Sequence, residues 1–138
     1  MRLYSWNVNG YRAAVRKGML GWLDAARPDV LCLQETKVDP VVLASEILRP
    51  CGYESYWAVP AEKKGYNGVA TLARVPVQAW QAGFGVERFD VEGRVVFTDL
   101  GSVELYNVYF PNSGRGPERL AYKLEFYASE PREYSSTR

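Results

Sequence analysis

The chain has 138 residues, of which 47% are hydrophobic and 24% are charged. This size fits one domain, and the composition is that of a soluble globular protein with no membrane span, which needs about 18 consecutive apolar residues. The net charge of +1 gives no strong overall field, so a site for a polyanion must come from local clustering. The absence of histidine excludes Ser-His-Asp triads and histidine zinc sites, and two cysteines are too few for a disulfide scaffold.

The N-terminal part of the chain predicts alternating strands and helices. Residues 2–8 alternate polar and apolar side chains, as strands do. Residues 11–17 and 19–26 have helical spacing and are separated by Gly18. The apolar run 30–33 is typical of a strand buried on both faces. This order has the length of a βαβ unit, although the spacing leaves the direction of strand pairing open.

The rest of the chain predicts a helix at 41–48 followed by a largely antiparallel meander. The expected strands of the meander are 53–58, 68–73, 77–82, 93–100 and 104–110. Helical spacing returns at 119–127, and the end of the chain contains no aliphatic residue. We therefore expect a domain at 1–127 and a disordered tail at 128–138. The first residues do not resemble a signal peptide, which fits a reducing cytoplasm.

Three of the apolar runs end in polar side chains that can bind phosphate or a hard cation. Asn7 ends the first run, Glu35 follows the second, and Tyr109 and Asn112 end the last. In layered α/β proteins, ligand sites collect where strands finish. A carboxylate there suits Mg²⁺, and a tyrosine hydroxyl and an amide can contact one phosphate. Each motif alone also fits a structural role: a strand-ending turn, a solvated glutamate, or a core tyrosine before a turn.

Two further loops carry groups suited to a phosphate backbone. The segment KKGYNG at 63–68 combines lysines with a tyrosine that can stack on a base, and the same composition describes a solvated hairpin. In the motif EGR, Arg94 either reaches into a site or flanks a strand.

Five motifs together give the chain a resemblance to a known family. The segments WNVNGYRA, LQETK, GYNGVA, EGR and YFPNSGRG, which begin at Trp6, Leu33, Gly65, Glu92 and Tyr109, occur in the order and spacing of the exonuclease III type of AP endonuclease. That family belongs to the endonuclease/exonuclease/phosphatase superfamily, and the similarity extends to about residue 127. It implies an α/β fold that is half of a four-layer α/β-sandwich, with one mixed, largely antiparallel sheet and helices on its outer face.

The resemblance also implies roles for individual residues. Glu35 and Asn7 resemble the metal site, for Mg²⁺ or Mn²⁺, and Tyr109, Asn112 and Asn7 resemble the catalytic groups. The positions that resemble the DNA-facing rim are Arg12, Lys17, Lys37, Tyr66, Arg94, Arg115 and Arg119. Lys64, from the basic loop, is expected to bind DNA with them.

The implied function is Mg²⁺-dependent phosphodiester hydrolysis in double-stranded DNA, at abasic sites and 3′ ends. In members of this family, the C-terminal half supplies Gly-Asp-X-Asn and Ser-Asp-His segments that activate the attacking water. Neither segment occurs in this sequence. We therefore expect a truncated chain that is weakly active or inactive alone and binds DNA more readily than it turns over. We also expect an uncovered inner sheet face that takes a complementary C-terminal half or leads to self-association.

Two alternatives remain open at this point. One is a catalytically dead DNA-binding or interaction fragment. The other is a phosphoesterase of the same superfamily that acts on a substrate other than DNA.

Overall fold

The computed structural model describes residues 1–112 and 117–128. In chain order the elements are β1 (Leu3–Asn7), α1 (Tyr11–Arg16), α2 (Met19–Ala26), β2 (Val30–Gln34), the 3₁₀ turn η1 (Pro40–Val42), α3 (Ser45–Leu48), the 3₁₀ turn η2 (Pro50–Gly52), β3 (Glu54–Ala58), β4 (Val69–Ala73), β5 (Ala79–Ala82), α4 (Glu87–Asp90), β6 (Val95–Asp99), β7 (Glu104–Val108) and α5 (Pro117–Ala128). Of the tail expected at 128–138, Ala128 is the last residue of α5, and the remainder lies outside the described residues, as does the rim residue Arg115. No helix within 1–112 or 117–128 has the length and apolar character needed to cross a bilayer.

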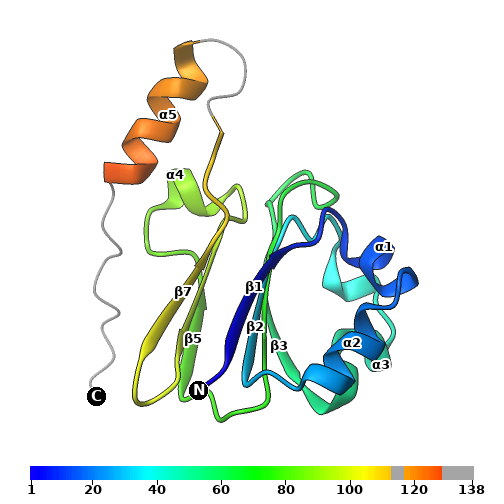
Figure 1. The fold of residues 1–138 in the computed structure, drawn as a ribbon. Helices are drawn as coiled ribbons and strands as arrows, with labels where there is room; N and C mark the ends of the chain where they lie inside the picture. The colour runs from blue at the N-terminus through cyan, green and yellow to red at the C-terminus, as the bar shows by residue number, and fades with distance from the viewer. Residues whose placement is uncertain (113–116, 129–138) are drawn as a thin grey trace.

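The first sheet is mixed and has the strand order β1-β2-β4-β3. β1 and β2 are parallel, with Asn7 opposite Gln34, so the β1-α1-α2-β2 segment is the expected βαβ unit. Gly18, with its left-handed backbone, separates α1 from α2, as the sequence predicts. Helices α1, α2 and α3 cover the outer face of this sheet (Figure 1). Leu31 and Leu33 belong to the core on that side.

The second sheet is antiparallel and has the strand order β5-β6-β7. It packs face to face on the first sheet, where Val30 and Cys32 share a core cluster with Leu100, and Val69 shares one with Val96. Helix α5 packs with α4 against the outer face of the second sheet, near one end (Figure 1). The α/β class and the helices outside a mixed sheet are therefore confirmed.

Two expectations about the layers are wrong. The strands form two sheets rather than one, and the inner face of the first sheet is covered by the chain's own second sheet. The chain leaves β4 after Ala73 and passes through Pro76, which cannot donate a backbone hydrogen bond, before β5 begins. Alternation of side chains gives the period of a strand but not the sheet that the strand joins.

The helix expected at 41–48 is also divided. The Asp39 side chain accepts a hydrogen bond from the Val41 N–H and caps the turn η1. Leu43 and Ala44 then adopt extended backbone dihedrals, so a new helix, α3, begins at Ser45. The short helix α4 is not anticipated by the sequence pattern, since four residues are too few to show helical periodicity.

We expect Gly93→Ala to destabilise the fold sharply. Gly93 has a φ of +64°, and a Cβ atom there would lie 2.4 Å from the carbonyl carbon of Val59 and 2.5 Å from the Pro60 nitrogen. Backbone strain and this clash together should lower the free energy of unfolding by about 2–4 kcal/mol. Gly18→Ala is the matched control: its φ is +102°, but nothing lies within 4 Å of the added atom. Urea denaturation should give a loss of about 1 kcal/mol for the control, and equal losses would show that the contact at Val59 is unimportant.

Candidate active site

Three loops meet at the end of the first sheet where β1 and β2 finish. The N–H of Gly10 donates to the carbonyl of Glu35 at 2.7 Å, and the N–H of Lys37 donates to the carbonyl of Asn67 at 2.9 Å. Asn7 ends β1 in the turn that its residue type favours, because its Oδ1 accepts a hydrogen bond from the Asn9 N–H at 3.1 Å. The segments after β1, after β2 and before β4 therefore meet at one end of the first sheet.

The central contact of this edge joins the two sheets. The hydroxyl of Tyr109, directly after β7, donates a hydrogen bond to Oε1 of Glu35, directly after β2. Glu35 has a φ of +53°, a left-handed conformation that costs of order 1–3 kcal/mol in a residue other than glycine. Lys37 lies on the other side of the carboxylate, with its Nζ 3.7 Å from Oε2 of Glu35 and 2.6 Å from Oδ1 of Asn9.

The chemical state of Tyr109 follows from its surroundings. Burial and the hydrogen bond to Glu35 raise the pKa of Tyr109 to about 12. The phenol is therefore fully protonated at neutral pH and acts as a hydrogen-bond donor. A protonated hydroxyl beside a carboxylate and an ammonium group is suited to binding a phosphate oxygen together with a cation.

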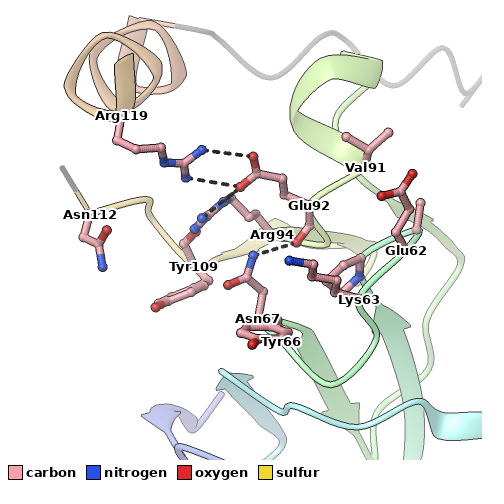
Figure 2. A pocket seen from close by; sticks show the side chains of 12 residues that line it. Glu62, Lys63, Tyr66, Asn67, Val91, Glu92, Arg94, Tyr109, Asn112 and Arg119 are labelled. Atoms are coloured by element: carbon pink, nitrogen blue, oxygen red, sulfur yellow. Dashed lines mark hydrogen bonds and ion pairs between the residues drawn. The ribbon is translucent and has the colours of Figure 1, made fainter. Parts of the chain in front are cut away.

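Beside Tyr109 lies an open pocket of about 720 Å³ (Figure 2). At its floor Glu92 holds two arginines: its carboxylate is 3.0 Å from the Arg94 guanidinium and 3.3 Å from that of Arg119. The Asn67 amide donates to the Glu92 carbonyl at 3.1 Å, so the loop before β4 is tied to the same cluster. The pocket thus combines basic, aromatic and amide groups from four parts of the chain: Lys63, Tyr66, Asn67, Arg94, Tyr109, Asn112 and Arg119.

Glu92→Gln should weaken the fold in a manner that depends on pH. Burial raises the pKa of Glu92, but the hydrogen bonds and charges of Arg119 and Arg94 outweigh burial and hold it below the usual carboxyl range. A lowered folded-state pKa contributes stability above the unfolded pKa, and this contribution is lost as the pH falls through the folded value. The variant should lose about 2 kcal/mol at pH 7, and the deficit should shrink toward about pH 3.

Urea denaturation of both proteins at several pH values measures this difference. Glu62→Gln is the control, because Glu62 lines the same pocket and is exposed. A deficit of constant size across the acidic range would contradict the ion-pair explanation.

The remaining rim residues are placed differently from one another. Arg12 in α1 and Lys17 directly after it are exposed. Tyr66 is 64% exposed, and the Lys63 ammonium lies over its ring, with Nζ 5.6 Å from the ring centre. Lys64 is exposed and lies 3.7 Å from a carboxylate oxygen of Asp39.

The position of Arg94 differs from the one expected from the sequence. It was expected on the DNA-facing rim, but only 5% of it is exposed, and its guanidinium is 3.1 Å from the Tyr109 carbonyl. The guanidinium can be buried because Glu92 neutralises it and accepts its hydrogen bonds. Arg94 therefore supports the backbone beneath Tyr109.

Sequence reasoning also missed residues that build the site. Lys63 lines the pocket, whereas only its neighbour Lys64 was selected. The supporting residues Asn67 and Glu92 belong to the motifs KKGYNG and EGR. Their position in these motifs is the feature of the sequence that could have indicated their role. Asn107 is a polar residue in an apolar strand pattern, and it turns out to be buried between the sheets.

Comparison with known proteins identifies the family. The model of the endonuclease/exonuclease/phosphatase family matches residues 4–135. The chain belongs to this family.

Relatives within the family are nucleases. The chain is 42% identical over 127 residues to the exodeoxyribonuclease of Bacillus subtilis, which covers 91% of this chain and 49% of that protein. It is 41% identical over 124 residues to the DNA repair nuclease APEX1 of Danio rerio, covering 89% and 40%. These names confirm the resemblance to exonuclease III and AP endonucleases.

Solved structures give the same result for the fold. A 3′-5′ exonuclease from Neisseria meningitidis superimposes with a TM-score of 0.78 at 29% identity, covering 93% of this chain and 49% of that one. The catalytic domain of Xenopus laevis APE2 superimposes with a TM-score of 0.77 at 34% identity, covering 93% and 51%. The chain spans about half the length of these structures and of the Bacillus relative.

Metal-dependent nucleases are typical of this family, so the donor set at the loops must be compared with a metal site. Tyr109 contacts Oε1 of Glu35, whereas Oε2 lies 3.7 Å from the Lys37 ammonium. The Asn7 amide oxygen keeps a second lone pair beside its bond to Asn9. Oxygen donors of this kind fit Mg²⁺, which retains several waters. Within 1–112 and 117–128, no group of three or more His, Cys, Asp or Glu side chains is placed to hold a metal. The donor set fits a hydrated Mg²⁺ held by few protein ligands.

Proposed function

We propose that this chain carries the metal-binding and phosphate-binding part of a DNA repair nuclease that hydrolyses phosphodiesters at abasic sites and 3′ ends. The observation that supports this function most strongly is the hydrogen bond from Tyr109 to Glu35 across the two sheets. A protonated donor thus lies beside a potential metal ligand, so that one phosphate oxygen could be bound by the hydroxyl and another by the metal.

Each residue has a defined part in this proposal. Glu35 and the Asn7 amide oxygen hold Mg²⁺, or Mn²⁺ in its place. A bound Mg²⁺ supplies Lewis-acid polarisation of a phosphoryl oxygen. Tyr109 turns its hydroxyl proton to the phosphate, and Asn112, which lines the same pocket, donates its amide to a neighbouring oxygen. Lys37 adds a positive charge beside the carboxylate.

Double-stranded DNA would lie over this edge, with Arg12, Lys17, Lys64 and Arg119 near the phosphates and Tyr66 against a base or sugar. The groups of this chain bind and polarise a phosphate, but the sequence has no histidine and no Asp-X-Asn segment to activate water. This observation favours a second candidate function, DNA binding by this polypeptide without turnover.

A surface at β1 is available for a partner that would complete the site. Within the described residues β1 pairs only with β2, and the side chains of Leu3, Tyr4, Trp6 and Trp22 are exposed beside its free edge. An exposed strand edge with an apolar surface is an association site. We propose that a complementary C-terminal half covers it, since the structural relatives are about twice as long. Light scattering distinguishes this arrangement from self-association, in which the apparent mass of the chain alone rises with concentration.

Binding of Mn²⁺ tests the metal part of the proposal. The paramagnetic ion should broaden the backbone NMR signals of Gly10, Glu35 and Lys37 first, and Glu35→Gln should abolish the selectivity. Glu54→Gln is the matched control, because Glu54 is exposed at the opposite end of the first sheet. Broadening that survives Glu35→Gln, or that Glu54→Gln removes, would contradict the assignment of the ligand.

A further inference from the structure

The two sheets are joined by a buried amide directly beneath the contact between Tyr109 and Glu35. Asn107 in β7 is 2% exposed. Its Nδ2 donates to the carbonyl of Ala70 at 2.9 Å and to Oγ1 of Thr71 at 3.1 Å, both in β4. Its Oδ1 accepts a hydrogen bond of 2.8 Å from Nε2 of Gln34 in β2. One side chain of the second sheet therefore contacts two central strands of the first.

The link continues across the first sheet. Nε2 of Gln34 also donates to Oγ of Ser5 in β1 at 3.0 Å. Gln34 thus connects β1 and β2 to Asn107, and Asn107 connects them to β4. Asn107 is the buried member of this network, and both its amide nitrogen and its amide oxygen are hydrogen-bonded. A buried amide that is satisfied in this way favours one arrangement of the strands that it joins.

The positions of these amides relate them to the candidate active site. Asn107 is two residues before Tyr109, so both side chains emerge on the inner side of the second sheet. Gln34 is the residue before Glu35. Neighbouring residues of a regular strand point to opposite faces, but the left-handed backbone of Glu35 lets its carboxylate meet Tyr109 on the side where Gln34 meets Asn107.

We propose that Asn107 and Gln34 are positioning residues that set the distance and angle at which Tyr109 meets Glu35. The inference rests on the proposed function, in which this pair binds the metal and the phosphate. The hydrogen bond between Asn107 and Gln34 fixes the position of β7 over β2 close to the site, since Gln34 directly precedes Glu35 and Asn107 lies two residues before Tyr109. The hydroxyl of Tyr109 is then held at the carboxylate, because neither strand can slide without leaving buried amide groups unpaired.

A positioning role accounts for an amide at residue 107, between sheet faces that otherwise contact each other through apolar side chains. Leu105, on the same face of β7, packs in the core cluster that contains Val30 and Cys32. An apolar residue at 107 would retain such packing but would specify no register, since apolar contact is not directional. Register matters here because a displacement near 1 Å at a catalytic group costs about 10²-fold in rate.

The test uses the ¹³Cζ NMR signal of Tyr109, which reports the hydrogen bond of its hydroxyl. The full 138-residue chain is labelled at its ten tyrosines, and Tyr109→Phe assigns the signal. Glu35→Gln supplies the reference shift for loss of the carboxylate acceptor. We expect Asn107→Leu to move the Tyr109 signal in the same direction and by most of the same displacement.

Leu105→Ala is the matched control, because it removes packing between the same sheets from the same face of β7 without touching the amides. It should leave the Tyr109 signal in place even where urea denaturation shows an equal loss of stability. Gln34→Leu removes the bridge from the other sheet and should reproduce the shift of Asn107→Leu. This variant decides the question if Asn107→Leu fails to fold.

An unchanged Tyr109 signal in both amide variants would overturn the inference, as would an equal displacement in Leu105→Ala. Failure of the proposed function has a different signature. If the wild-type chain does not bind duplex DNA while the amide variants still shift the Tyr109 signal, the bridge is established and the assignment as a nuclease fails.

Discussion

The purified 138-residue chain should degrade duplex DNA from its 3′ ends about 10²- to 10⁴-fold more slowly than the Bacillus subtilis exodeoxyribonuclease assayed beside it with Mg²⁺. In the proposed function, Glu35 and Asn7 hold the metal that polarises the phosphate, and Tyr109 binds the phosphate. The attacking water, however, lacks the groups that activate it in the resembled family, because the sequence contains neither histidine nor an Asp-X-Asn segment. Loss of a general base commonly reduces the rate by this amount.

Single-turnover cleavage of an end-labelled duplex measures the difference. Glu35→Gln of the same chain controls for a contaminating nuclease, whose activity the substitution would leave unchanged. Cleavage at the rate of the relative, abolished by Glu35→Gln, would show that this chain activates water by groups that we have not assigned.

Binding to duplex DNA should fall about 10²-fold between 50 and 200 mM salt if about four phosphates are neutralised. The expected contacts are the exposed cations Arg12, Lys17, Lys37 and Lys64 and the half-buried Arg119. Arg94 is not counted, because it is buried against Glu92. Fluorescence anisotropy of a labelled abasic duplex at several salt concentrations gives the slope.

Lys17→Gln should lower this slope by about one, since one fewer counterion is released. Arg74→Gln is the matched control: Arg74 is exposed and follows β4 at the end of the first sheet away from Glu35. A slope near zero in the wild-type chain, or equal losses from both substitutions, would argue against phosphate binding at this edge.

Local structure could largely be predicted from the sequence. The apolar run at β2 is buried throughout, and Gly18 divides α1 from α2, because burial pattern and backbone freedom are expressed within a few residues. The division into two sheets could not be predicted in this way. Each strand of the meander has the same period whether it extends the first sheet or begins another.

The sequence indicated which residues belong to the candidate site, but not how their side chains are arranged. Asn7, Glu35 and Tyr109 each follow or end a strand, which is visible in the sequence, and the structure brings Glu35 and Tyr109 together. Their contact and the burial of Arg94 depend on tertiary packing. A charged residue near the start of an expected strand is usually exposed, and only the pairing with Glu92 shows why Arg94 is buried.

Reconstitution with a relative tests the central claim most directly. The 138-residue chain would be joined to the half of the Bacillus subtilis exodeoxyribonuclease that it does not match, and Mg²⁺-dependent cleavage of an abasic duplex would be measured. We predict that cleavage rises at least about 10²-fold over the chain alone, and that Glu35→Gln or Tyr109→Phe in this chain removes the gain. A folded, DNA-binding chimaera whose cleavage is unaffected by both substitutions would contradict the assignment of Glu35 and Tyr109 to the active site.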